Sequence, residues 1–124
     1  MIGIFKALGD ENRLRILNLL MHSKLCVCEI EVMLDMTQSN VSRHLSKLKS
    51  SGIISSSKDA QWVHYKVSNE SKRENEFLFK YLSKEFDKND IFQKDLERYD
   101  KYKKFNLNCQ RITEDKENIL NLIK

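Results

Sequence analysis

The residues best suited to chemistry in this sequence are its three cysteines. Two of them stand two positions apart, as Cys26 and Cys28, and the third, Cys109, lies far along the chain. Thiolates are soft ligands for metalloid and metal ions, and neighbouring thiols can also oxidise. An odd number of cysteines does not suit a disulfide framework. The cysteines therefore indicate an ion-binding or redox-sensing site.

The spacing of Cys26 and Cys28 restricts how both thiols can hold one ion. In a regular helix, residues two positions apart point about 200° away from each other. Cys26 is therefore expected at or before the N-cap of a helix that runs over about 27–34. The amino terminus of a helix lowers the pKa of a thiol and so favours the reactive thiolate.

Three further helices are expected around this pair. Apolar residues recur at helical spacing over 2–8, about 11–21 and about 38–51. Asp10 is expected to cap the second of these helices, and Gly52 to end the third.

A β-hairpin is expected after these helices. Residues 61–67 alternate between apolar and polar side chains and follow the polar turn 58–60. The fold class is therefore mainly α with a small β-hairpin, in which the hairpin is the wing of a winged helix-turn-helix. Its inward side is expected to carry Val63, Tyr65 and Val67, and its outward side Trp62, His64 and Lys66.

The helix over 38–51 exposes a surface suited to double-stranded DNA. No Asp or Glu occurs between Met36 and Lys58, although the chain holds 18 acidic residues. Amides and arginine can pair with base edges in the major groove, whereas hydroxyls and lysines reach phosphates. Lys58, at the hairpin tip, either touches DNA or belongs to a hairpin that only braces the helices. The expected contacts on the helix are Gln38, Ser39, Asn40, Ser42, Arg43 and Lys47.

The carboxy-terminal half is expected to serve dimerisation. A helix over about 73–87 carries a wider apolar stripe than one small domain needs, which suits pairing with a second copy in a twofold dimer. Helical spacing resumes over 92–102, and Thr113 is expected to cap a last short helix. Residues 1–88 are therefore assigned to DNA binding and dimerisation, and 89–124 to a helical extension of the same domain.

Composition sets the outer limits of the interpretation. The chain has 124 residues and a formal net charge of +4, which fits one domain and permits nucleic-acid binding. It has no apolar run of membrane-spanning length and no signal-peptide pattern. We therefore expect a cytoplasmic protein with no membrane partner.

Five segments together resemble the ArsR/SmtB family of metal-sensing transcriptional repressors, and most closely its arsenic-sensing branch. The resemblance implies a homodimer that represses its operator without any cofactor and releases DNA when As(III) or Sb(III) binds. It also implies that Cys26 and Cys28 belong to the inducer site and that His44 lies on the recognition helix, although His44 can equally pack. The segments are 5–10, 12–17, 25–29, 38–48 and 62–65.

The sequence departs from the best-known arsenic-sensor motif at one position. A third cysteine is expected three residues after Cys28, where this chain has Glu31. Arsenite normally takes three thiolates, and a carboxylate is a hard and therefore poor substitute. Cys109 is the candidate third ligand, from the same subunit or across the dimer, unless it is an ordinary partly buried thiol.

Several alternatives stay open. Cd(II) or Pb(II) sensing shares the Cys-Val-Cys motif but usually adds amino-terminal cysteines, which this sequence does not show, and a thiol redox switch would use the same cysteines. Zinc or nickel sensing through a carboxy-terminal helix is disfavoured because all three histidines precede residue 65. A small thiol reductase would need Cys-x-x-Cys in a βαβ context. A protein-binding winged helix is the remaining alternative.

Overall fold

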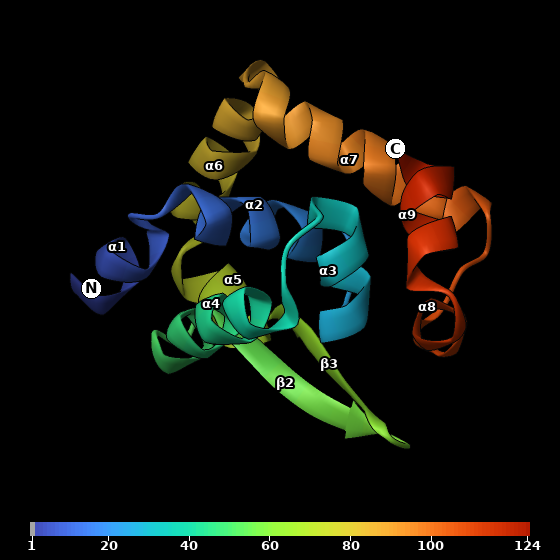
Figure 1. Ribbon diagram of the computed structural model, residues 1–124. Coiled ribbons are helices and arrows are strands. Elements are labelled where there is room, and N and C mark those ends of the chain that lie inside the picture. Colours follow the sequence, from blue (N-terminus) through green and yellow to red (C-terminus); the bar gives the residue numbers. More distant parts are fainter. Residues whose placement is uncertain (1) are drawn as a thin grey trace.

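The computed structural model describes residues 2–124, which form nine helices and a three-stranded antiparallel sheet in the order β1-β3-β2 (Figure 1). The helices are α1 (Ile2–Leu8), α2 (Glu11–Leu20), α3 (Val27–Leu34), α4 (Gln38–Ser50), α5 (Asn69–Glu74), α6 (Glu76–Lys88), α7 (Asp90–Lys104), α8 (Cys109–Glu114) and α9 (Lys116–Ile123). The strands are β1 (Leu25–Cys26), β2 (Ile54–Asp59) and β3 (Trp62–Val67).

The first four helices lie where the sequence predicts them. The Asp10 side chain caps α2 by accepting from the Arg13 amide at 3.1 Å. Thr37 caps α4 in the same way, and Gly52 follows that helix at φ 85°, where glycine has no steric penalty. The inward residues of α4 are almost fully buried against α2 and α3: Val41, Leu45 and Leu48.

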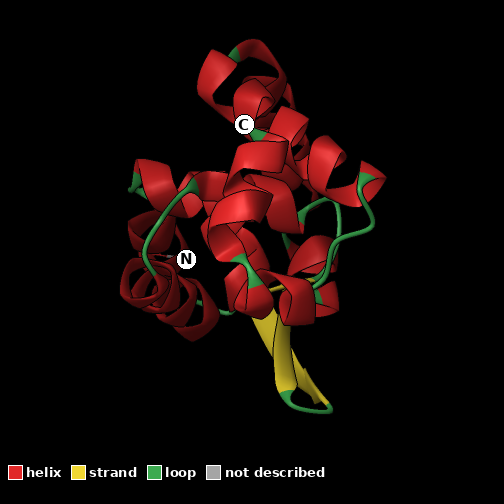
Figure 2. Cartoon of the chain, turned by 45° about the vertical axis from the view of Figure 1, so that its right-hand side comes forward, coloured by secondary structure: helices red, strands yellow, loops and turns green. Residues whose placement is uncertain are grey.

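The hairpin extends from the body of the molecule as a thin wing, which Figure 2 shows most clearly. The turn falls at Ala60 and Gln61, later than predicted, since β2 continues to Asp59. The prediction that Val63 faces the domain is wrong, because Val63 lies near the wing tip and is 39% exposed. Trp62 and His64 are half-buried instead of fully outward.

The sequence predicts a two-stranded hairpin without the short strand β1. In the structure β1 pairs with β3, so the sheet has three strands. Leu25 pairs with Tyr65, and Cys26 pairs with His64, both in antiparallel register. A two-residue strand gives no alternating pattern in the sequence, so only its partner strand reveals it. Its consequence is that the amino-terminal end of α3 is joined directly to the wing.

Two boundaries in the carboxy-terminal half differ from the prediction. The single helix expected over 73–87 is divided at Asn75, whose φ of −122° and ψ of 38° are not helical. Thr113 does not cap the last helix, because it lies inside α8 and its hydroxyl donates to the Cys109 carbonyl at 2.9 Å. Asp115 is the cap of α9 and accepts from the Asn118 amide.

Helix α7 packs across α2 and α3, and helices α8 and α9 pack against α3 (Figure 1). Their buried apolar residues join the core built by the first four helices. A buried ion pair adds to this packing: Arg15 on α2 donates twice to Asp95 on α7, and both bonds are 2.9 Å long. None of the helices within residues 2–124 is long and apolar enough to cross a membrane.

Candidate ion site and DNA-facing helix

The three cysteines meet at the point where α8 packs against the start of α3. The sulfur of Cys109 lies against the sulfurs of both Cys26 and Cys28, which are themselves 3.1 Å apart. One sulfur can join only one disulfide, so these contacts describe a three-sulfur cluster and not a single cross-link. All three thiols come from one chain, and a single ion could contact all of them.

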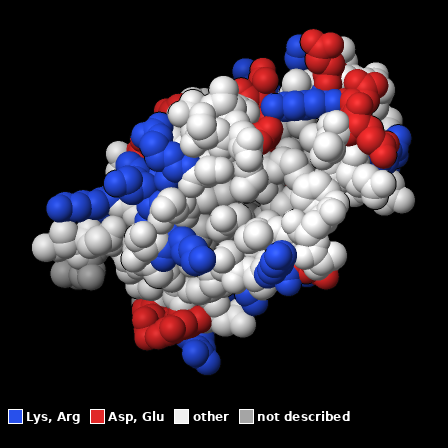
Figure 3. Space-filling model, turned by 60° about the horizontal axis from the view of Figure 1, so that its bottom comes forward, with Lys and Arg blue, Asp and Glu red and all other residues white. Residues whose placement is uncertain are grey.

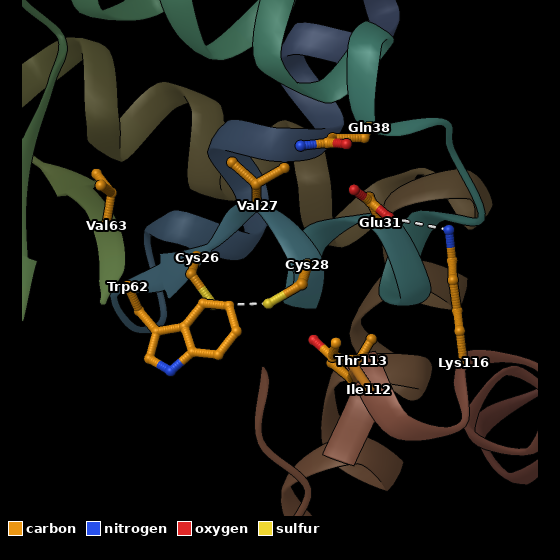
Figure 4. A pocket seen from close by; sticks show the side chains of 10 residues that line it. All are labelled: Cys26, Val27, Cys28, Glu31, Gln38, Trp62, Val63, Ile112, Thr113 and Lys116. Atoms are coloured by element: carbon orange, nitrogen blue, oxygen red, sulfur yellow. Dashed lines mark hydrogen bonds and ion pairs between the residues drawn. The ribbon is translucent and has the colours of Figure 1, made fainter. Parts of the chain in front are cut away.

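The backbone at the start of α3 brings Cys26 and Cys28 to the same side. Cys26 is the N-cap residue, in extended conformation at φ −97° and ψ 169°, as the sequence predicts. The Glu29 carboxylate turns back and accepts from the Cys26 amide at 3.1 Å, which completes a capping box. Because Cys26 lies outside the helical turn, its thiol can point toward Cys28 (Figure 4).

Cys109 reaches this pair because the chain reverses after α7. Asn106 adopts a left-handed conformation at φ 57°, and Asn108 then caps α8 by accepting from the Arg111 amide. Leu107 and Ile112 are buried beside Cys109, which is only 6% exposed. The third thiol is therefore buried together with the apolar residues that flank it in the sequence.

A cavity of about 450 Å³ opens beside the sulfur cluster, between α3, the wing and the carboxy-terminal helices. Figure 4 shows Glu31 on its wall pointing toward Lys116, with which it forms an ion pair of 2.9 Å. The residue that replaces the expected third cysteine thus binds α9 to α3. Gln38, the first residue of α4, also lines this cavity, so the ion site and the DNA-facing helix are neighbours.

Most of the residues predicted to contact DNA lie on one exposed surface. Arg43 donates to the Asn40 side chain at 3.3 Å, which orients the guanidinium along the exposed side of α4. Figure 3 shows Lys and Arg side chains across this end of the molecule, with acidic side chains mostly at its margins. The exposed residues are Gln38, Ser39, Asn40, Ser42, Arg43 and Lys47 on α4, and Lys58 on β2.

His44, which the resemblance also placed on the recognition helix, does not share that surface, and the structure shows the packing alternative. Its side chain is 4% exposed and lies on the inward side of α4 with Val41, Leu45 and Leu48. These positions follow the i, i+3, i+4, i+7 pattern of a buried stripe. Burial lowers the pKa of His44, while the nearby Asp10 carboxylate opposes that shift.

Two residues near the sulfur cluster were missed by sequence reasoning. Tyr102 is 1% exposed and donates from its hydroxyl to Glu29 at 2.6 Å. Burial, followed by this hydrogen bond, raises the pKa of Tyr102 well above its usual range. The Cys-x-x-Glu spacing could have indicated Glu29 as part of a capping box, whereas no local signal connects α7 to it.

Comparison with known sequences gives a consistent result. Residues 10–56 match the family model described as bacterial regulatory protein, arsR family. The cadmium resistance transcriptional regulatory protein CadC of Listeria innocua is 44% identical over 68 residues, which are 54% of this chain and 57% of that protein. The arsenical resistance operon repressor of Escherichia coli is 46% identical over 68 residues, 54% of this chain and 58% of that protein. The chain thus spans a little over half the length of these curated relatives.

Solved structures extend the likeness to the fold. Reduced HlyU from Vibrio cholerae is 36% identical with a TM-score of 0.55, over 64% of this chain and 85% of HlyU. The homodimeric winged helix-turn-helix DNA-binding domain Mb0332 from Mycobacterium bovis is 26% identical with a TM-score of 0.60, over 68% of this chain and 78% of that domain. The fold of the present chain is a winged helix-turn-helix.

Proposed function

This chain belongs to the ArsR family of bacterial regulatory proteins, and we propose that it is a repressor which releases operator DNA when trivalent arsenic or antimony binds its three cysteines. The relatives are regulators of transcription and not enzymes, which removes the thiol reductase alternative. The observation that carries the proposal is the three-sulfur cluster of Cys26, Cys28 and Cys109.

The number and kind of donors favour a trivalent metalloid. As(III) binds three soft thiolates in a pyramid, and three thiols of one chain converge here. Glu31 does not take the place of the third thiolate ligand, because its carboxylate is paired with Lys116. Cd(II) or Pb(II) is the alternative inducer, because relatives with both cadmium and arsenical names match this chain almost equally well. A redox-responsive alternative would use the same three thiols.

The position of the cluster suggests how ion binding reaches the DNA. Cys26 and Cys28 begin α3, and α4 follows α3 after a turn in which Asp35 is left-handed at φ 53°. We expect an ion to draw the start of α3 and the start of α8 together, and so to shift α4 relative to the wing. The free-energy coupling between two such sites is typically about 1–3 kcal/mol.

A binding titration tests this function. The protein is titrated into a labelled DNA duplex selected from random sequences, with and without arsenite, Cd(II) or peroxide. We expect arsenite to weaken DNA binding by about 5- to 150-fold, the range that such coupling gives. A larger effect of Cd(II) or of peroxide would favour the corresponding alternative. Binding should also fall steeply as salt rises, whereas a protein-binding winged helix would show no affinity for the duplex.

Dimerisation is supported by an exposed apolar surface on α1 and α6, both on the left of Figure 1 and far from α8. Four of the most exposed large apolar or aromatic residues lie there: Ile2 at 69%, Phe5 at 61%, Phe77 at 82% and Tyr81 at 60%. A soluble monomer rarely exposes such a group, and Mb0332 is homodimeric. We propose that this surface pairs two copies about a twofold axis.

Replacing Phe77 with glutamate is expected to produce a monomer with weakened DNA binding. Twofold symmetry places the new carboxylate in both halves of the interface, where each charge would be buried without a partner. Sedimentation velocity measures the change in mass. The matched control is Phe105→Glu, at an exposed aromatic after α7. A Phe77→Glu protein that stays dimeric while Phe105→Glu dissociates would place the interface elsewhere.

A further inference from the structure

We propose a second ion site beside the sulfur cluster, in which Cys26, Glu29 and His64 hold a borderline divalent cation such as zinc. One ligand atom from each of the three residues lies within 4.8 Å of the other two. The site shares only Cys26 with the sulfur cluster. It stands apart from the arsenic response proposed above, because Glu29 and His64 take no part in the sulfur cluster.

The backbone fixes all three donors before any ion arrives. Cys26 and His64 are directly opposite each other in the β1–β3 pair, so their side chains leave the same side of the sheet. The capping box turns Glu29 back over Cys26, where the thiol donates to the carboxylate at 3.2 Å. The Tyr102 hydroxyl holds the other oxygen of Glu29. Cys26 and Glu29 therefore have little side-chain entropy left to lose on binding.

His64 gives the second, independent sign of a ligand. Its Nδ1 atom is buried and has no hydrogen-bond partner among residues 2–124. A buried nitrogen without a partner is costly, by about 1–3 kcal/mol, and most proteins avoid it. A cation bound through Nδ1 would accept the nitrogen lone pair and remove that cost.

The donor set selects the class of ion. One thiolate, one imidazole and one carboxylate form a combination that suits zinc, and the two negative charges balance a divalent cation. As(III) prefers three thiolates and gains nothing from Glu29 or His64. A small cavity of about 190 Å³, lined by Glu29, His64 and Cys109 among others, adjoins the donors. It leaves room for a water molecule as the fourth ligand.

Sharing Cys26 has a direct consequence. Zinc in this site would join the start of α3 to strand β3 of the wing, whereas arsenite in the sulfur cluster would join α3 to α8. Both ions need the Cys26 thiolate, so we expect them to compete for it. Zinc binding would also displace the proton that the Cys26 thiol now shares with Glu29, and this proton passes to solvent.

The test uses Co(II), whose visible and near-ultraviolet bands report coordination geometry and thiolate ligation, followed by displacement with Zn(II). The Cys28→Ser/Cys109→Ser protein keeps Cys26 as its only thiol. We expect it to bind one Co(II) per chain with a single thiolate charge-transfer band. Adding His64→Gln should weaken that binding by at least about tenfold. The matched control is His22→Gln, at a histidine whose ring packs at a tilt against Tyr99 outside the site.

Two further measurements test the same site without the His64 variant. Glu29→Gln retains a cap acceptor but removes the carboxylate charge, and it should also weaken Co(II) binding. In the parent protein, arsenite should expel Co(II) one for one. The proposal is overturned if the thiolate band is absent from the double variant, if His64→Gln binds Co(II) as well as His22→Gln does, or if the parent holds both ions together. Failure of arsenite to release DNA would instead overturn only the proposed function.

Discussion

Replacing Cys109 with serine is expected to abolish the arsenite-induced release of DNA while leaving DNA affinity without arsenite close to that of the parent. The variant removes one of three thiols that meet in the sulfur cluster and so leaves only two soft donors for As(III). Cys109 is a buried residue of α8, so its loss removes no side chain from the exposed surface of α4 and should not alter DNA contacts. With arsenite present, Cys109→Ser should therefore bind DNA about 5- to 150-fold more tightly than the parent, since it loses the whole coupling between the two sites.

X-ray absorption spectroscopy on the arsenic-loaded protein counts the As–S bonds directly. Three As–S bonds are expected in the parent and two in Cys109→Ser. The control is Gln110→Ala, at the exposed neighbouring position of α8, which should respond to arsenite like the parent. Full release of DNA by arsenite in Cys109→Ser would mean that Cys26 and Cys28 suffice, and Cys109 would then be only a packing residue.

Replacing Arg15 with methionine is expected to lower the free energy of unfolding by about 3 kcal/mol, the cost of leaving a buried charge without its partner. Asp95 is 1% exposed and receives two hydrogen bonds from the Arg15 guanidinium. Arg98, whose nearest guanidinium nitrogen is 3.6 Å from Asp95, offsets part of the loss, so we expect the lower end of the usual range. Urea unfolding at a fixed protein concentration measures the difference.

A double variant separates charge from packing at this position. Arg15→Met/Asp95→Leu removes both charges together and should recover most of the lost stability, since apolar replacements of buried ion pairs are often neutral. The matched control is Lys80→Met, which breaks the exposed Lys80–Glu76 pair and should change stability by less than about 1 kcal/mol. A double variant as unstable as Arg15→Met would show that the guanidinium acts through packing instead.

Local signals explain how much of the fold was predictable. Helices α1 to α4, their caps and the Cys26 N-cap follow from side chains within a few residues of each other, and the structure confirms them. The wing was predicted from alternation, but β1 was not, because a strand of two residues has no pattern of its own. The burial of His44 follows from its i+3 position in the apolar stripe, whereas the resemblance left packing and DNA contact equally open for this residue.

The candidate site likewise has a part that the sequence predicts and a part that only tertiary packing creates. The sequence by itself determined that two thiols stand at a helix start and that the chain holds one more thiol, because type and spacing are local facts. Only the tertiary structure decided that Cys109, more than 80 positions from Cys26 and Cys28, reaches the same sulfur cluster. It likewise decided that His64 stands opposite Cys26 and that Tyr102 holds Glu29. Such contacts depend on how α7 and α8 pack against α3, where apolar burial sets the geometry and no local spacing encodes it.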